Sequence, residues 1–200
     1  MRIHKITESR NHGITRSSVP VFSCSRKGFT IIEILVAIGI MTMLALIYAA
    51  NFRGFQQGLT VQSDTDRLAG TIRQAQIWAL TGELVNGTRP DGGYGIYIPS
   101  PCTSGVCNFT VFANTCTPSS YAYDSGCDTI VRTENFNDLV NISGATPASP
   151  LTLVFTPPSA EVYANNVKSS SATVTLAHRH QTTKILTIAI DGVSGQVNVQ

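Results

Sequence analysis

Residues 26–38 read RKGFTIIEILVAI, and they place one acidic side chain, Glu33, inside a stretch that is otherwise apolar. From residue 29 to residue 50 the chain holds 22 residues in which Glu33 is the only charge. A helix of about 20 apolar residues spans the hydrocarbon layer of a membrane. A buried helix of a soluble core is the alternative, but such helices rarely run this far without a polar face. The stretch therefore predicts a membrane-inserted helix over 29–50.

The segment before this helix is basic. Residues 1–28 hold six Lys or Arg side chains and one Glu, a net charge of +5. An excess of Lys and Arg beside a membrane helix keeps that side in the cytoplasm, so we expect the chain after residue 50 to lie on the other side. Of the 14 basic and 12 acidic side chains of the whole protein, residues 29–200 keep 8 and 11, a net charge of −3. Such a chain has no general electrostatic attraction to nucleic acid.

Four of the five cysteines lie within 26 residues of the outer part, at Cys102, Cys107, Cys116 and Cys127. In an exported chain this spacing indicates two disulfides with three possible pairings. The simplest pairing joins Cys102 to Cys107 and Cys116 to Cys127. A zinc site is the alternative, but the spacings include no C-x-x-C pair. The fifth cysteine, Cys24, lies in the basic segment.

The sequence changes from a helical to a strand pattern near Gly82. Before it, four apolar residues spaced four, three and four apart share one face of an amphipathic helix predicted over 51–82: Leu68, Ile72, Ala75 and Ala79. Gly54 and Gly58 favour a bend or loosened turn in this helix.

Eight short segments after residue 82 are rich in β-branched and aromatic residues and are separated by Gly, Pro, Ser and Asn. They are 94–98, 109–113, 129–133, 151–155, 160–163, 171–177, 184–190 and 195–200. A helix followed by strands predicts an α+β protein, in which the amphipathic helix packs on the antiparallel sheet of a head over 83–200. We expect the stretch 100–128, which holds the four outer cysteines, to be a surface excursion held by its disulfides.

Gly28 followed by FTIIEILVAIGI resembles the processing site of class III signal peptides in type IV prepilins and type II secretion pseudopilins. The resemblance rests on the basic tail, on Gly28 before the cut, on Phe29 after it and on Glu33 at the fifth place after it. It implies that a membrane prepilin peptidase removes residues 1–28 on the cytoplasmic face and methylates the new amino group of Phe29. It also implies a pilin-like fold, in which 29–50 is the transmembrane and assembly helix.

Glu33 gains a physical explanation from this resemblance. A carboxylate in the hydrocarbon region costs about 2.5–3.5 kcal/mol on insertion scales, and such residues usually mark a partner. In the family this partner is the N-terminal amino group of a neighbouring subunit, here that of Phe29, so the resemblance implies a role for Glu33 in assembly and methylation. Pairing of Glu33 with its own N-terminus, about one helical turn away, is the alternative.

The later part of the chain resembles a narrower group, the GspH/FimT-type minor pilins and minor pseudopilins. This resemblance rests on RQAQIWALTGE (73–83) at the helix end and on KILTIAIDGVSGQVNVQ (184–200) at the chain end. Some FimT-type proteins act in DNA uptake through a Gly-Arg-x-Arg pattern near the chain end. Here Gln196 and Asn198 stand at the two arginine positions, so two phosphate contacts are missing and we expect no nucleic-acid binding by that route.

No motif in the chain indicates an enzyme or a cofactor. DGVSGQ has Gln196 where a G-x-S-x-G nucleophile elbow needs its second Gly. His178 and His180 could bind a metal, but we interpret them as a solvated polar tip. Asp64 and Asp66 indicate a charged helix face rather than an acid/base pair. We therefore expect a protein that is not an enzyme and that holds no cofactor or metal.

The leading function is that of a minor pilin or pseudopilin, a subunit of a type IV pilus or type II secretion filament. Its expected partners are the prepilin peptidase, other pilin or pseudopilin subunits and the inner membrane. The alternatives are an adhesive or DNA-uptake role at a filament tip, with 102–127 as the binding surface, and a membrane-tethered enzyme. We expect a single-pass protein of the inner (cytoplasmic) membrane with an extracytoplasmic head, which later joins an extracellular pilus or a periplasmic pseudopilus.

Overall fold

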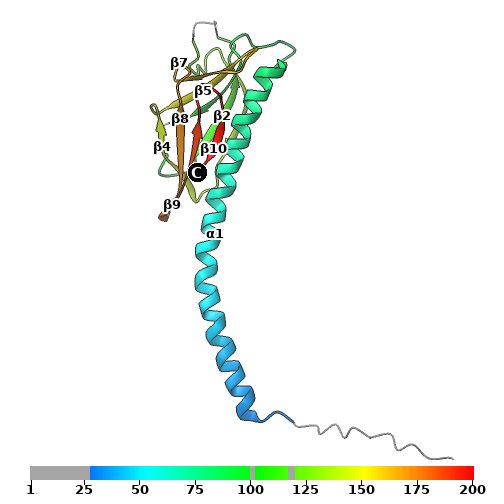
Figure 1. The fold of residues 1–200 in the computed structure, drawn as a ribbon, viewed down its shortest axis with the longest axis vertical. Coiled ribbons are helices and arrows are strands. Elements are labelled where there is room, and N and C mark those ends of the chain that lie inside the picture. The colour runs from blue at the N-terminus through cyan, green and yellow to red at the C-terminus, as the bar shows by residue number, and fades with distance from the viewer. Residues whose placement is uncertain (1–27, 100–101, 117–119) are drawn as a thin grey trace, which may run out of the picture. The chain divides into compact units, whose positions relative to one another are not determined.

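The computed structural model describes residues 28–99, 102–116 and 120–200. Residues 1–27 of the predicted leader, Cys24 included, lie outside these ranges. Within them the chain forms one helix, α1 (Ile31–Thr81), and ten strands (Figure 1). The strands are β1 (Tyr94–Ile98), β2 (Asn108–Ala113), β3 (Thr129–Asn135), β4 (Val140–Thr146), β5 (Leu151–Thr156), β6 (Glu161–Ala164), β7 (Val167–Lys168), β8 (Ala172–His178), β9 (Gln181–Ile190) and β10 (Val197–Val199). The chain divides into two compact units, Met1–Ala45 and Leu46–Gln200, and the second unit holds all of these strands.

The strands form two antiparallel sheets. The first sheet has the order β3-β2-β1-β5-β6-β7, and the second has the order β10-β9-β8-β4. Strand β5, which pairs with β1 and β6, is buried along its whole length. Gly95 in β1 shows how tightly the first sheet is packed, because a Cβ atom there would collide with the ring of Phe112 and the carbonyl oxygen of Leu153. Only glycine fits at this position.

One hydrophobic core joins the second half of α1 to both sheets. The helix face predicted from the sequence is buried, and each of its four residues is 1% exposed or less: Leu68, Ile72, Ala75 and Ala79. These side chains share a core cluster with Phe109 and Leu153 of the first sheet and with Val174 and Ile188 of the second. The predicted α+β fold, a long N-terminal helix and an antiparallel β head, is confirmed.

The helix α1 runs without interruption past Gly54 and Gly58, so the bend expected there does not break it. It ends at Thr81, and Gly82 after it takes a positive φ of 68°. The backbone N–H groups of Gly82 and Glu83 both donate to the carbonyl oxygen of Trp78, at 2.9 and 3.2 Å. A glycine in the left-handed conformation is a common way to cap the last carbonyls of a helix.

Two strands lie where no strand was predicted. β4 reads VNISGAT, and a register shift between Ile142 and Gly144 interrupts its pairing with β8. β7 has only two residues. Neither segment shows the regular apolar alternation on which strand prediction depends.

The strand predicted at 109–113 is present as β2, so the stretch 100–128 is not a surface excursion along its whole length. Strand β2 lies between β1 and β3 in the first sheet. Phe109, Val111 and Phe112 of this strand are fully buried. The surface excursion is confined to the polar, cysteine-containing segments before and after β2.

Candidate functional site

The predicted processing residues lie at the start of α1. Gly28 and Phe29 precede the helix, and Phe29 is 77% exposed. Thr30 caps the helix, because its carbonyl oxygen and its Oγ1 accept hydrogen bonds from the backbone N–H of Glu33 at 3.1 and 3.3 Å. Glu33 is the acidic residue of the first turn, where the helix dipole favours a carboxylate. Thr30 and Glu33 have the T-x-x-E spacing of a capping box, a signal that our sequence analysis missed.

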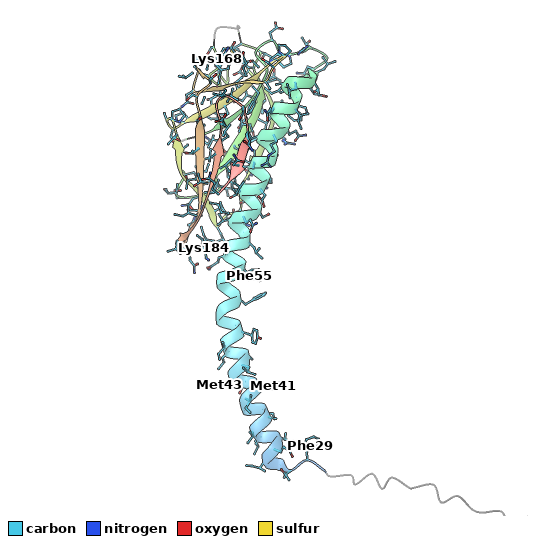
Figure 2. All side chains as sticks on the ribbon, in the orientation of Figure 1. Phe29, Met41, Met43, Phe55, Lys168 and Lys184 are labelled. Carbon is cyan, nitrogen blue, oxygen red and sulfur yellow. A yellow bond between two sulfur atoms is a disulfide. The ribbon has the colours of Figure 1, made fainter. Side chains whose placement is uncertain are left out.

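The first part of α1 is apolar on all sides. Ile31–Ala49 comprises 19 residues with a mean hydropathy of 2.5, and none of its most apolar stretch is buried in the structure. At 1.5 Å per residue this segment extends about 28 Å, close to the hydrocarbon thickness of roughly 30 Å. Met41 and Met43 are 70% and 68% exposed (Figure 2). By length and composition this segment can cross a membrane.

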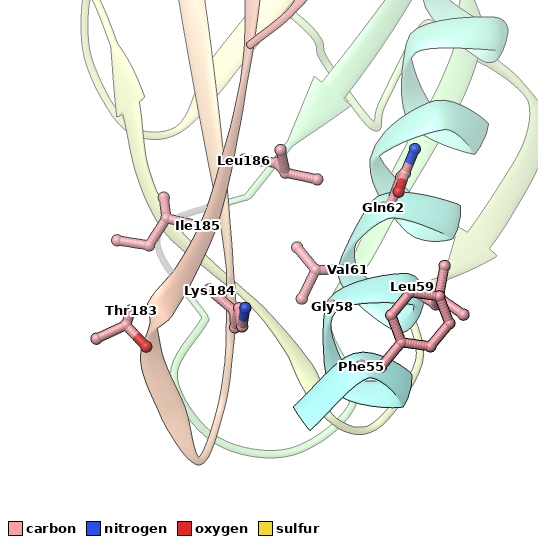
Figure 3. Close-up of a pocket in the computed structure, with 9 residues that line it drawn as sticks. All are labelled: Phe55, Gly58, Leu59, Val61, Gln62, Thr183, Lys184, Ile185 and Leu186. Carbon is pink, nitrogen blue, oxygen red and sulfur yellow. The ribbon is translucent and has the colours of Figure 1, made fainter. Parts of the chain in front are cut away.

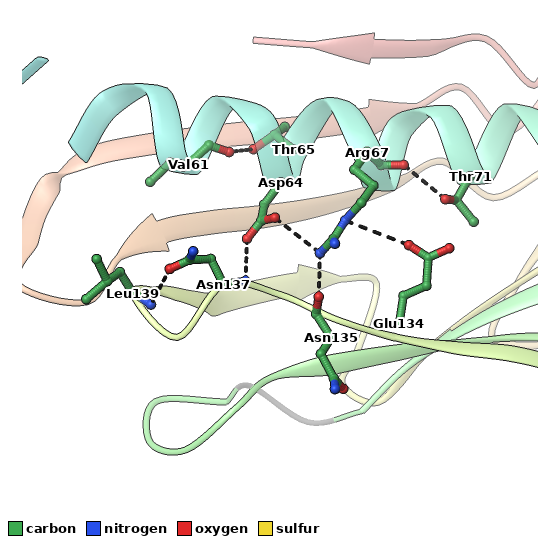
Figure 4. Close-up of polar contacts among 9 residues, drawn as sticks. All are labelled: Val61, Asp64, Thr65, Arg67, Thr71, Glu134, Asn135, Asn137 and Leu139. Carbon is green, nitrogen blue, oxygen red and sulfur yellow. Dashed lines mark hydrogen bonds and ion pairs between the residues drawn. The ribbon is translucent and has the colours of Figure 1, made fainter. Parts of the chain in front are cut away.

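The second part of α1 is attached to the head by a buried carboxylate. Asp64 is 7% exposed, accepts a hydrogen bond from the backbone N–H of Asn137 at 2.7 Å and pairs with Arg67 at 3.1 Å (Figure 4). Arg67 also donates to the carbonyl oxygen of Asn135 and lies 3.7 Å from the carboxylate of Glu134. The predicted charged helix face is therefore wrong for Asp64, which contacts the loop after β3.

A second set of polar contacts joins α1 to strands of both sheets. The guanidinium of Arg73 donates to the carbonyl oxygen of Val197 in β10 at 2.8 Å. On β3, Arg132 donates to Oε1 of Gln74 at 2.9 Å and lies over the ring of Trp78, 5.8 Å from its centroid. Charge-assisted hydrogen bonds and cation–π contacts of this kind fix the rotation of the helix about its axis.

Both disulfides join cysteines that are close in the sequence. Cys102 bonds to Cys107, and Cys116 bonds to Cys127. Of the three pairings that the sequence left open, the simplest is therefore the one formed. The two bridges lie before and after β2.

The loop between β2 and β3 is organised around Asp128, which is 8% exposed. Its carboxylate accepts hydrogen bonds from the backbone N–H groups of Thr115, Cys116 and Asp124 at 3.1, 3.3 and 2.8 Å. The side chain of Asp124 lies beside the sulfur atoms of the Cys116–Cys127 bridge. Because these sulfur atoms are oxidised, they do not offer the thiolates that a metal site would need.

The prediction that His178 belongs to a solvated polar tip is wrong. It is 1% exposed at the end of β8, where it pairs in register with Val140 of the unpredicted strand β4. Its Nδ1 accepts the backbone N–H of His180 at 3.2 Å. Burial, and then the proximity of His180, lower the pKa of His178 below the ordinary value. His180 is exposed, so the prediction is wrong for His178 alone.

The polar residues of the turn between β9 and β10 stabilise the turn by hydrogen bonds to one another. The backbone N–H and hydroxyl of Ser194, together with the N–H of Val193, donate to Asp191 and hold the pKa of its carboxyl below the ordinary value. Ser194 therefore serves as a turn residue. Gln196 and Asn198, at the positions of the missing arginines, are both exposed.

Residues 24–49 match the family described as the prokaryotic N-terminal methylation motif. The matched range contains Gly28, Phe29 and Glu33 and ends with the apolar segment at Ala49. The N-terminal segment carries a prepilin-type methylation motif.

Two crystal structures of the type IV minor pilin FimU of Pseudomonas aeruginosa (strain PAO1) are similar in fold to this chain. One has 12% sequence identity and a TM-score of 0.45 and covers 70% of this chain and 91% of its own. The other, in a second crystal form, has 11% identity and a TM-score of 0.46 and covers 73% and 92%. No curated protein matches the chain in sequence.

Proposed function

We propose that this protein is a minor subunit, of the GspH/FimT type, in a type IV pilus or type II secretion filament. The observation that carries the proposal is the contrast in burial along α1. The apolar segment Ile31–Ala49 is exposed, whereas the head buries one face of the helix from Val61 to Ala79. An apolar helix needs apolar surroundings, which a membrane supplies before assembly and other subunits' helices supply in a filament.

A prepilin peptidase would create the mature N-terminus. In this proposal it cuts after Gly28, removes the basic residues 1–28 and methylates the amino group of Phe29. Gly28 and Phe29 are exposed and lie outside the helix, which favours access by a peptidase. The cut also removes Cys24, while the four cysteines of the head pair with one another.

Glu33 then pairs with the amino group of Phe29 on a neighbouring subunit. Its carboxylate costs about 2.5–3.5 kcal/mol at the centre of a membrane and less near the interface, and an intersubunit ion pair offsets that cost on assembly. The Thr30 cap engages the backbone N–H of Glu33 and not its carboxylate. Capping and intersubunit pairing are therefore compatible.

We assign the head to the extracytoplasmic side, where disulfides form and persist. A structural role is favoured over an enzymatic one because Ser194, Asp64 and His178 all have structural partners. Nucleic-acid binding through the chain end is not part of the proposal, because Gln196 and Asn198 are neutral.

Intact-mass measurement of protein from membranes and from sheared surface filaments tests this function. The expected species begins at Phe29 and carries one added methyl group in both fractions. Substitution Gly28→Val should retain residues 1–28 and exclude the protein from filaments. A mature species that still carries Arg26 and Lys27, or a processed chain that is absent from filaments, would contradict the proposal.

A further inference from the structure

The head leaves one apolar hollow open and covers another apolar surface with its own chain. The open hollow is a groove of about 280 Å³ between α1 and the first half of β9, where Val61 and Leu186 face one another (Figure 3). The covered surface is the outer face of the first sheet, opposite to the face that packs on the core. The segment 120–127, here called the strap, belongs to the β2–β3 loop and crosses this outer face. The Cys116–Cys127 disulfide ties the end of the strap.

A row of cross-strand partners defines the outer face. Phe112 in β2 lies opposite Gly95 in β1, which lies opposite Val154 in β5. Val154 in turn lies opposite Tyr163 in β6. The side chains of such partners share one face of the sheet, and Phe112 and Val154 are fully buried although neither belongs to the core cluster on the other face. The strap covers this row, because the ring centroid of Tyr123 lies 4.9 Å from that of Phe112.

Two stacked tyrosines join the strap to β6. The ring centroids of Tyr121 and Tyr163 are 3.8 Å apart, and the ring planes are inclined by 24°. The backbone N–H of Tyr121 donates to Oδ1 of Asn166 at 2.8 Å, which fixes the position of this part of the strap. The side-chain amide of Asn114 donates to the carbonyl oxygen of Ser120 at 2.9 Å and fixes the residue before it. Both rings are half-buried, so they contact one another and remain within reach of small molecules.

The other tyrosines are less suited to coupling in pairs. The chain holds six tyrosines, all within the described residues. Tyr97 and Tyr123 also pack on one another, but their ring centroids are 4.6 Å apart and Tyr123 shares its contacts with Phe112. Tyr94 is 1% exposed and its phenol donates to a backbone carbonyl oxygen. Tyr48 lies in the apolar segment of α1. The stacked pair between the strap and β6 therefore has the closest contact between two phenol rings.

We propose that Tyr121 and Tyr163 form a site of oxidative cross-linking, where a peroxide and a haem peroxidase join the two rings as dityrosine. Hydrogen peroxide takes one electron and one proton from each phenol and is reduced to two water molecules. The two phenoxyl radicals form one bond between ring carbons ortho to oxygen, and the hydrogen on each of these carbons moves to the oxygen and restores the hydroxyl group. Contact between the rings before oxidation favours this coupling over an encounter between two molecules. The bond adds a second covalent tie to the strap, and it goes beyond the filament function without depending on it.

Oxidation of the full chain in detergent with hydrogen peroxide and a haem peroxidase tests the site. We expect a monomeric product that is lighter than the parent by two hydrogen atoms. After reduction of the disulfides, its peptide map should contain a dityrosine that joins the peptide with Tyr121 to the peptide with Tyr163. A map that joins Tyr97 to Tyr123 instead, or cross-links only between two copies of the chain, would overturn the proposal. The absence of any dityrosine would overturn it as well.

Phenylalanine substitutions assign the cross-link to this pair. Tyr163→Phe keeps a ring that stacks on Tyr121 but removes the phenol, so the joined peptides should be lost while the unfolding midpoint in denaturant stays close to wild type. Tyr121→Phe should lose them too. Tyr97→Phe is the matched control, because it removes a phenol from the neighbouring pair and should leave the yield unchanged. Loss of the product in Tyr97→Phe, or an unchanged yield in Tyr163→Phe, would contradict the assignment without affecting the mass and filament measurements that test the proposed function.

Discussion

The two halves of α1 belong to one helix but differ in the distribution of their apolar side chains. In Ile31–Ala49 exposed apolar side chains occur all around the helix. From Val61 on, the head buries one apolar face of the helix, whereas Ile77 and Leu80 lie off that face and are exposed. Arg67 and Arg73 donate hydrogen bonds to the head. A periodic apolar face therefore indicates a partner within the same chain, whereas an apolar surface without a period indicates a partner outside it.

The largest expected effect is the loss of stability of the head when a leucine of the buried half of α1 is truncated. Leu68 is fully buried in the core, so Leu68→Ala should lower the free energy of unfolding of the head by about 2–5 kcal/mol. Leu44→Ala removes the same atoms from the exposed half and should change this free energy by less than about 0.5 kcal/mol. Denaturant unfolding of the detergent-solubilised protein, followed by Trp78 fluorescence, measures both. If both substitutions lowered the free energy of unfolding equally, the two halves of α1 would not differ in their contribution to the core.

A smaller effect tests the polar attachment of the second half. Asp64→Ala leaves the backbone N–H of Asn137 without its acceptor and Arg67 without one partner, which should cost about 1–3 kcal/mol. Asp66→Ala, two residues along the same helix, removes an exposed carboxylate and should cost less than about 0.5 kcal/mol. The same unfolding measurement applies. If Asp66→Ala cost as much, the contact in Figure 4 would not be the source of the stability.

The smallest expected effect concerns pH and is confined to the head. Burial lowers the pKa of His178 in the folded protein, so the unfolded chain binds more protons as the pH falls below its own pKa of about 6.5. Above pH 6.5 His178 is neutral in both states and its protonation does not lower the free energy of unfolding. As the pH falls from 6.5 toward the lower pKa of His178 in the folded protein, that free energy decreases. Unfolding midpoints at pH 5 and pH 7 should therefore differ less in His178→Gln than in wild type. His180→Gln, at an exposed position, should keep most of the difference between the midpoints at pH 5 and pH 7. If His178→Gln kept that difference unchanged, burial of His178 would not be its cause.

Much of this arrangement could be read from the sequence because the deciding signals are local. The span over Ile31–Ala49 and the buried face that includes Leu68 depend only on composition and spacing along one helix. Strand β4 was missed because it mixes Asn, Ser and Gly with few apolar residues. Missing it also hid the burial of His178, which pairs with Val140 of that strand.

The long-range partner of Asp64 could not be predicted from the sequence, whereas Arg67, three residues along the same helix, could have been. The carboxylate of Asp64 accepts a hydrogen bond from the backbone N–H of Asn137, which is 73 residues away. Every residue except proline has such a backbone N–H, so the sequence does not indicate which one is the donor. The cap at Thr30 is different, because its T-x-x-E spacing was visible and was overlooked. Long-range backbone contacts could not have been predicted, whereas this local cap could.

The most direct test of the account is the partition of Glu33→Val between the membrane and sheared-filament fractions, compared with wild type and with the N-terminus determined in each. The substitution removes the carboxylate but keeps the backbone N–H that Thr30 caps, so α1 should still form and insert. Cleavage after Gly28 should continue, while the chain should be lost from filaments, because an unpaired ammonium on Phe29 is costly in apolar surroundings. Processed Glu33→Val in filaments at the wild-type level would contradict the assembly role assigned to this residue.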